Sequence, residues 1–202
     1  MAGAVHVLLA LLVATAAAQE PVKVSVFFET LCPDSIAFFN SQLEPAWNTI
    51  RDIMEVDLTA YGFATATPSG DGYVFDCQHG DDECQGNKVE ACAKAYISDY
   101  ETYVDFSICL MTGEYPPTEG ETCAEKVGVE WAAIGECAQS TEGETLLYLQ
   151  GQEQDALQPA PDWIPWIIIN DVYTADNLVE AQLDLIGLVC RTYEGTPPAG
   201  CS

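Results

Sequence analysis

The chain has 202 residues, of which 49% are hydrophobic, and its 32 acidic residues outnumber six basic ones to give a formal net charge of −26. This composition excludes an intrinsically disordered chain, and the negative charge makes nucleic acid and anionic membrane surfaces unfavourable partners. The length suits a single domain with a hydrophobic core and an insertion.

The N-terminal segment is typical of a secretory signal peptide. An apolar run over residues 5–18 ends in three alanines, Ala16 to Ala18, which form a small-residue cleavage site before Gln19. The run is too short to span a bilayer, and no later apolar run reaches the roughly 18 residues that a spanning helix needs. We therefore expect residues 1–18 to be removed and the mature protein to be lumenal or secreted, without a membrane partner.

Nine cysteines, all of them after residue 18, indicate an oxidising compartment. Eight of them could close four disulfides and leave one free thiol, although parity does not identify the free cysteine. Cys32 is the cysteine whose surroundings suit that role. The other eight are Cys77, Cys84, Cys92, Cys109, Cys123, Cys137, Cys190 and Cys201.

Residues 22–47 predict a strand that runs directly into an amphipathic helix. Val22, Val24 and Val26 alternate with polar residues, which is the period of a strand with one covered face. After residue 33 apolar side chains recur every three or four positions, so we expect a helix with one apolar stripe and a kink at Pro45. These apolar residues are Ile36, Phe39, Leu43, Trp47 and Ile50.

Cys32 lies at the junction of this strand and helix. Pro33 suits the first helical position, where a missing amide hydrogen costs nothing. The positive end of the helix dipole favours the thiolate of a cysteine there, and the thiolate is the nucleophilic form. The alternative is that Cys32 is a small buried hydrophobic residue. Its position at a helix N-terminus favours a reactive cysteine.

The next segments predict a second strand and then a loop. Val56, Leu58 and Ala60 alternate with polar residues, and a strand here would be parallel to the first in a right-handed βαβ unit. Residues 62–72 are rich in Gly, Pro and Thr, which predicts a loop that leaves the sheet.

Helical spacing dominates the middle of the chain. It extends over residues 87–111, and a further helix is expected after Thr122. Residues 141–144, with sequence TEGE, have the form of a capping box that starts another short helix. We therefore predict a helical insertion, pinned by disulfides, over about residues 77–158.

The C-terminal part predicts a return to the sheet. A Pro-rich segment, residues 158–165, leads into the apolar run Trp166–Asn170, a buried strand, and a short strand is expected at residues 172–173. Apolar residues from Leu178 to Leu188 predict the last helix, and Cys190 and Cys201 could tie the tail to it.

Residues 77–92 hold three cysteines and read as a stapled loop that opens onto a helix. A zinc site is the alternative, because Cys77, His79, Cys84 and Cys92 are all ligand types. The spacing lacks the paired C-x₂₋₄-C of structural zinc sites, and a lumenal location favours disulfides, so we expect no metal here. His79 could transfer protons, because histidine titrates near neutral pH, but in a Cys- and Gly-rich turn a structural role is favoured. Residues 81–83, with sequence DDE, are expected to form a solvated loop.

The same stretch matches the pattern CQHGxxECxxNxxxxC and resembles the signature of the gamma-interferon-inducible lysosomal thiol reductase (GILT) family. The matching residues are Cys77, Gln78, His79, Gly80, Glu83, Cys84, Asn87 and Cys92. The resemblance extends to the CPDS turn at Cys32, to LEPAW at residues 43–47, to IPWIIIND at 164–171 and to LVCRTYEG at 188–195. It implies an α/β, thioredoxin-like fold: a single domain over residues 19–202 with the helical Cys-rich insertion inside it.

Members of this family are similar in being thiol reductases that open protein disulfides in acidic compartments. By resemblance Cys32 is the nucleophile, and Ser35 stands where a dithiol motif has its second cysteine. The Ser35 hydroxyl could donate a hydrogen bond to the Cys32 thiolate but cannot resolve a mixed disulfide. Two functions stay open: a monothiol enzyme whose intermediate is resolved by an external small thiol, or a non-catalytic member that binds peptides or holds a mixed disulfide.

The thioredoxin-like resemblance also implies a substrate-binding segment opposite Cys32. It assigns a cis bond to Ile164-Pro165 and an exposed backbone edge there, with which an extended substrate peptide could pair. No Gly-rich phosphate loop follows a strand, so we expect no nucleotide or other cofactor.

The expected partners are disulfide-containing proteins and a small-molecule thiol as reductant, with the protein itself a monomer. Lysosomal and extracellular locations both stay open, because the chain has no Asn-x-Ser/Thr site and no C-terminal ER-retention signal. The acidity likewise has two explanations, solubility or an acidic compartment in which self-repulsion falls as carboxylates become protonated.

Overall fold

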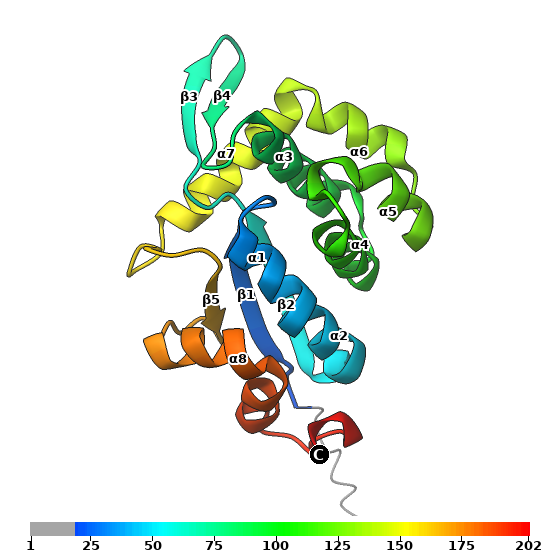
Figure 1. The fold of residues 1–202 in the computed structure, drawn as a ribbon, viewed down its shortest axis with the longest axis vertical. Helices are drawn as coiled ribbons and strands as arrows, with labels where there is room; N and C mark the ends of the chain where they lie inside the picture. The colour runs from blue at the N-terminus through cyan, green and yellow to red at the C-terminus, as the bar shows by residue number, and fades with distance from the viewer. Residues whose placement is uncertain (1–18) are drawn as a thin grey trace, which may run out of the picture.

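The structure is a computed structural model that describes residues 19–202, so the predicted signal peptide lies outside the described residues. A three-stranded sheet has the order β2-β1-β5. Strand β1 (Val22–Phe28) pairs in parallel with β2 (Met54–Ala60) and antiparallel with β5 (Trp166–Ile169), as Figure 1 shows. Because β1 is the central strand, it is buried along almost its whole length, and the prediction that only one face is covered is wrong.

The predicted βαβ unit is confirmed by the parallel register, in which Val22 pairs with Met54. Its helical connection consists of α1 (Pro33–Phe38), a π-helical segment (Phe39–Leu43) and α2 (Glu44–Ile50). Pro45 has no amide hydrogen to donate to the carbonyl four residues earlier. The wide π turn just before it is where the helix accommodates this missing bond.

The prediction of a loop over residues 62–72 is wrong, because most of this segment belongs to a β-hairpin. Strands β3 (Thr65–Ser69) and β4 (Gly72–Asp76) pair antiparallel and project from the rest of the molecule in Figure 1. Gly70 has a φ of +60° in the connecting turn, a conformation that glycine adopts without strain. Propensity alone could not identify these strands, since most of β3 is exposed to solvent and lacks apolar alternation.

The middle of the chain is helical, as predicted, but with more breaks. The single helix expected over residues 87–111 is two helices, because Asp99 caps a new one by accepting a hydrogen bond from the Thr102 amide at 2.9 Å. Likewise Ser140, one residue before the predicted capping box, is the N-cap of a helix of 15 residues rather than a short one. The five helices are α3 (Asp81–Tyr96), α4 (Tyr100–Thr112), α5 (Gly120–Val127), α6 (Trp131–Ala138) and α7 (Thr141–Asp155).

After β5 the chain turns directly into the last helix, α8 (Ala175–Thr192). The strand predicted at residues 172–173 is wrong: only an isolated bridge joins Ile169 and Val172. Asn170 and Asp171 both have positive φ, so they reverse the chain before a strand can extend. None of the helices in the described part of the chain is both long and apolar enough to cross a membrane.

Four disulfides are present, and Cys32 is the free cysteine among residues 19–202, as predicted. The bridges are Cys77–Cys84, Cys92–Cys137, Cys109–Cys123 and Cys190–Cys201. The bridge between residues 92 and 137 joins α3 to α6 and the last one ties the tail to α8. One hydrophobic cluster includes residues of the sheet, of α1 and α2, of helices α3 to α6 and of α8.

A buried carboxyl between two of these helices makes stability depend on pH. Glu90 on α3 is 1% exposed, and one of its oxygens accepts a hydrogen bond from the Ser107 hydroxyl of α4 at 2.6 Å. Burial raises the pKa of Glu90 from 4.5 to about 7, against the lowering effect of Ser107. Because the folded-state pKa is the raised one, this contribution to stability is complete below about 4.5 and is lost as the pH rises through about 7.

Replacing Glu90 with glutamine is therefore expected to flatten the pH dependence of stability. The shift from 4.5 to about 7 corresponds to about 3 kcal/mol. Urea unfolding at pH 5 and pH 7.5 would show a smaller difference in the free energy of unfolding for Glu90→Gln than for the native protein. Glu121→Gln, which removes an exposed carboxyl on α5, serves as the control. If the free energy of unfolding depended on pH in the same way in Glu90→Gln and in the native protein, Glu90 would not be the group responsible.

Candidate active site

Cys32 occupies the N-cap position of α1, with Pro33 at the first helical position. The residue is only 6% exposed. Its carbonyl accepts the first helical hydrogen bond, from the Ile36 amide at 3.0 Å. Its Sγ lies 3.6 Å from the carbonyl oxygen of Ile164, to which the thiol donates. The strand-to-helix junction thus delivers a free thiol to the backbone of the segment that precedes β5.

The Ile164-Pro165 peptide bond is cis, as the thioredoxin-like resemblance implies. The structure therefore brings Cys32, Ile164 and Pro165 together from opposite ends of the chain. Both residues have little exposed surface, since Ile164 is only 3% exposed and Pro165 is also buried, and the pairing of a substrate backbone with this segment stays a prediction. The exposed residue of this segment is Trp163, with 53% of its surface accessible.

Ser35 is fully buried in the first turn of α1. Its hydroxyl oxygen accepts a hydrogen bond from the amide of Glu29, at a distance of 3.4 Å. The predicted bond from Ser35 to the Cys32 thiol is not among the hydrogen bonds of residues 19–202. The hydroxyl instead links the start of α1 to the residue that follows β1.

The signature segment forms a turn closed by the Cys77–Cys84 disulfide, from which α3 begins. Gly80 caps the helix with a φ of +87°, in the region that favours glycine. The zinc alternative weighed for this segment is excluded, because Cys77, Cys84 and Cys92 are all disulfide-bonded. Gln78 is exposed and His79 is partly so.

Two signature residues on α3 hold the short segment that leads into Cys32. The side-chain oxygen of Asn87 accepts hydrogen bonds from the Thr30 amide at 3.0 Å and from the Thr30 hydroxyl at 2.9 Å. Glu83 accepts one from the Leu31 amide at 3.3 Å. Gly86 allows this close approach, since a Cβ there would lie 2.4 Å from the Thr30 hydroxyl oxygen. The signature is therefore a support for the Cys32 loop.

The prediction that Glu83 belongs to a solvated loop is wrong, because its side chain is fully buried, whereas Asp81 and Asp82 are exposed. The helical spacing of residues 83 and 87, which places both on one face of α3, is the signal that could have indicated this. Glu29 was not identified from the sequence. A charged residue directly after a buried central strand is a recognisable signal for a functional position.

Glu29, His79 and Glu83 form one cluster beside this loop. The Nδ1 atom of His79 lies 2.6 Å from an oxygen of Glu83 and 3.5 Å from Oε2 of Glu29. Burial raises the pKa of Glu29 from 4.5 to about 7, opposed by the hydrogen bond from the Phe63 amide. The ligand atoms of the three residues all lie within 4.8 Å of one another, so this is the group in residues 19–202 that could hold a metal ion.

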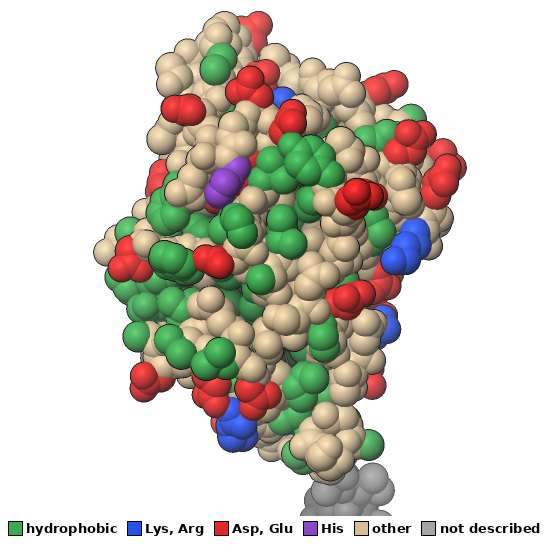
Figure 2. All heavy atoms as spheres, in the orientation of Figure 1, with side chains coloured by type: hydrophobic (Ala, Val, Ile, Leu, Met, Phe, Trp, Pro, Cys, Tyr) green, Lys and Arg blue, Asp and Glu red, His purple; other side chains and the backbone are tan. Residues whose placement is uncertain are grey.

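Exposed aromatic side chains surround the site. Phe63 is 42% exposed and donates its amide hydrogen to Glu29, while Tyr115 is 40% exposed and donates its hydroxyl hydrogen to Asp82. Trp163 adjoins Ile164. In Figure 2 the purple side chain is His79, and hydrophobic side chains gather beside it on the same face. This surface could contact apolar side chains of a bound peptide.

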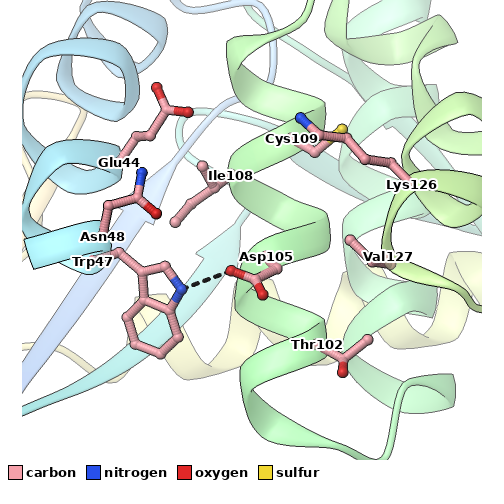
Figure 3. A pocket seen from close by; sticks show the side chains of 9 residues that line it. All are labelled: Glu44, Trp47, Asn48, Thr102, Asp105, Ile108, Cys109, Lys126 and Val127. Carbon is pink, nitrogen blue, oxygen red and sulfur yellow. Dashed lines mark hydrogen bonds between the residues drawn. The ribbon is translucent and has the colours of Figure 1, made fainter. Parts of the chain in front are cut away.

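A separate pocket of about 510 Å³ lies between α2 and the helices α4 and α5 (Figure 3). Its wall includes Trp47 of the LEPAW motif, whose indole nitrogen donates a hydrogen bond to Asp105 at 2.8 Å. None of the residues that position Cys32 lines it. The pocket is thus distinct from the thiol site.

Comparison with known proteins agrees with this geometry. The family model described as gamma interferon inducible lysosomal thiol reductase (GILT) matches residues 23–127. The gamma-interferon-inducible lysosomal thiol reductase of Carassius auratus is 35% identical over 90% of this chain and 72% of its own length. GILT-like protein 1 of Drosophila melanogaster is 33% identical over 98% of this chain and 86% of its own.

Among solved structures, DsbA of Chlamydia trachomatis superimposes with a TM-score of 0.56 at 12% sequence identity. The superposition covers 81% of this chain and 82% of that one. At this level of identity the likeness concerns the fold alone. The fold is thioredoxin-like, with the sheet and helices described above.

Proposed function

The chain belongs to the gamma-interferon-inducible lysosomal thiol reductase family, and we propose that it reduces disulfides in proteins through the single thiol of Cys32. Membership makes it a thiol oxidoreductase in general. The observation that carries the finer proposal is the position of Cys32, a free thiol at a helix N-terminus that contacts the carbonyl before a cis-proline.

The proposed cycle balances with an external thiol. The Cys32 thiolate attacks a substrate disulfide, forms a mixed disulfide and releases the other substrate sulfur as a thiolate, which takes up a proton. A small thiol then attacks Cys32 Sγ and releases the second substrate thiol. A second small thiol regenerates Cys32. Two small thiols are oxidised to one disulfide for each substrate disulfide reduced.

We assign substrate binding to the segment around Ile164 and Pro165. In the resting protein the Ile164 carbonyl is occupied by the Cys32 thiol, so formation of the mixed disulfide would free it to pair with substrate backbone. The exposed Trp163 and Phe63 flank the site and suit an extended peptide with apolar side chains. The proposed setting is an acidic lysosomal or extracellular space, with the protein acting as a monomer.

A second function is favoured by one observation: no resolving thiol accompanies Cys32 among residues 19–202. In this alternative the protein binds peptides or retains a mixed disulfide with a partner and does not turn over. It makes the same first covalent step. The two functions differ only in whether the intermediate is released.

The test is reduction of a protein disulfide at pH 5 with and without a small thiol, followed by mass spectrometry under non-reducing conditions. A monothiol reductase should form the mixed disulfide in both cases and turn over only when the thiol is added. A mixed disulfide that persists with added thiol would establish the holding function. No adduct at Cys32 under either condition would contradict both functions.

A further inference from the structure

Two buried carboxyl groups meet one imidazole beside the Cys32 loop. Glu29 directly follows β1 and Glu83 lies in the first turn of α3, and both side chains are fully buried. The Nδ1 atom of His79 lies 2.6 Å from Oε2 of Glu83 and 3.5 Å from Oε2 of Glu29. This one ring nitrogen therefore faces two carboxyl oxygens, and it is close enough for a good hydrogen bond to only one of them.

The oxygen that is left over is Oε2 of Glu29. It has no hydrogen-bond partner in the described part of the chain, although the other oxygen of this carboxyl accepts a hydrogen bond from the Phe63 amide at 2.6 Å. A buried carboxyl oxygen without a partner is costly, because it has lost its contact with water and gained none in return. The ligand atoms of Glu29, His79 and Glu83 all lie within 4.8 Å of one another, so the missing partner belongs in the space between them.

A divalent cation would supply that partner. Zinc binds carboxylate oxygens and imidazole nitrogens in a tetrahedral arrangement whose ligand atoms lie about 3.3 Å apart. The distance of 3.5 Å between Nδ1 of His79 and Oε2 of Glu29 already suits a shared ion. The distance of 2.6 Å to Glu83 would lengthen, because the metal would take the place of the hydrogen between the two atoms. The two carboxylates would also balance the charge of the ion, which lowers the cost of burying all three.

The fold holds these side chains in place without an ion. His79 and Glu83 both lie inside the short loop that the Cys77–Cys84 disulfide closes. Glu83 is fixed further, because its Oε1 accepts a hydrogen bond from the His79 amide at 3.0 Å and its Oε2 one from the Leu31 amide at 3.3 Å. Ligands that are fixed beforehand lose little conformational freedom on binding. The His79 side chain is 31% exposed, which gives an ion a path from solvent.

We propose that Glu29, His79 and Glu83 form a binding site for one zinc ion, which ties the end of β1 to the start of α3. His79 coordinates through Nδ1 and carries its hydrogen on Nε2, and water completes the fourth position. The imidazole ligand favours zinc over calcium and magnesium, which prefer oxygen ligands only. The site uses no cysteine, and it shares only His79 with the zinc site considered from the sequence. It goes beyond the proposed disulfide reduction and does not depend on it.

The test is calorimetric titration of metal-free Cys32→Ser protein with zinc chloride at pH 7. The substitution removes the free thiol, which could itself bind zinc, and about 0.15 M salt screens the net charge of −26. We expect one zinc ion per chain and no displacement of zinc by an equimolar amount of calcium. Thermal unfolding should shift to higher temperature with zinc, because the ion binds the folded state. Cobalt(II) in place of zinc should show the intense visible absorption of tetrahedral coordination.

Variants of the ligands locate the ion. In the Cys32→Ser background, Glu29→Gln should lower the affinity for zinc by at least about 100-fold, since even residues that only orient a ligand contribute up to that factor. His79→Gln, at a partly exposed site, should do the same, and it replaces the first variant if that one fails to fold. Asp81→Asn, which removes an exposed carboxyl from the same helical turn as Glu83, is the control and should leave the affinity unchanged.

Three results would overturn the site. One is the absence of saturable zinc binding to the Cys32→Ser protein, which would leave the cluster as a set of hydrogen bonds alone. The others are an unchanged zinc affinity in folded Glu29→Gln or His79→Gln and displacement of zinc by equimolar calcium, because the ion would then be a counter-ion on the acidic surface. These measurements need no substrate. A native protein that binds zinc in this way and reduces no disulfide would therefore support the site and contradict only the proposed function.

Discussion

Ser35→Cys is expected to release the protein from its need for an external thiol. A cysteine in the first turn of α1, three residues after Cys32, completes a CxxC motif at a helix N-terminus. The second sulfur would then attack the mixed disulfide within the molecule. The rate of such an oriented intramolecular attack exceeds the rate of attack by a millimolar external thiol by at least about 100-fold. Single-turnover release of reduced substrate without added thiol, followed by non-reducing mass spectrometry, measures the effect.

Matched variants show whether the new sulfur is responsible. Ser35→Ala should still need an external thiol, as the native protein does, since neither side chain can resolve the intermediate. Cys32→Ser should form no mixed disulfide and should lower disulfide reduction to the rate of the small thiol alone. Sulfur is larger than oxygen at this fully buried position, and overpacking of this kind typically costs about 1–3 kcal/mol. An intermediate that persists in folded Ser35→Cys would show that the two sulfurs cannot meet.

The largest expected loss of stability follows from removal of the bridge between Cys92 and Cys137. This disulfide joins α3 to α6 across 45 residues, and both cysteines are buried. Loss of a cross-link that closes a loop of this length should lower the free energy of unfolding by about 4 kcal/mol, because the unfolded chain gains entropy. The double variant Cys92→Ala/Cys137→Ala, compared with native protein by urea unfolding, measures it.

The bridge between Cys190 and Cys201 provides the comparison. It spans only 11 residues at the C-terminus, so its removal should cost about 3 kcal/mol and leave the Cys32 loop unaffected. Removal of the α3–α6 bridge should also reduce mixed-disulfide formation, since α3 carries the two residues that hold Thr30 and Leu31. If both bridge variants lost the same stability and both formed the mixed disulfide at Cys32 as the native protein does, this role of α3 would be contradicted.

Part of the structure could be predicted from the sequence because it depends on local or compositional signals. The alternation of valines in β1 and the proline after Cys32 are local, and they identified the strand, the helix start and the thiol between them. The parallel pairing of β1 with β2 follows from the short helical connection. The free Cys32 followed from an odd number of cysteines together with its position.

The hairpin and the helix breaks were missed for a different reason. Strand β3 is mostly exposed and has no apolar period, so only its pairing with β4 stabilises it. The break before α4 depends on one capping side chain, Asp99, inside a stretch whose apolar spacing is continuous. Periodicity reports which face is buried, and it does not report where hydrogen bonds end a helix.

By itself, the sequence determined the thiol at a helix N-terminus, the absence of a partner cysteine at position 35 and the supply of cysteines for four bridges. Only the tertiary structure decided what surrounds that thiol. Glu83 lies 52 residues from Leu31 along the chain, and its burial results from the packing of α3 against the loop before Cys32. A glutamate on a solvated loop and one buried beside the Cys32 loop have the same sequence context over short range. The difference between them is a long-range contact, which no local pattern specifies.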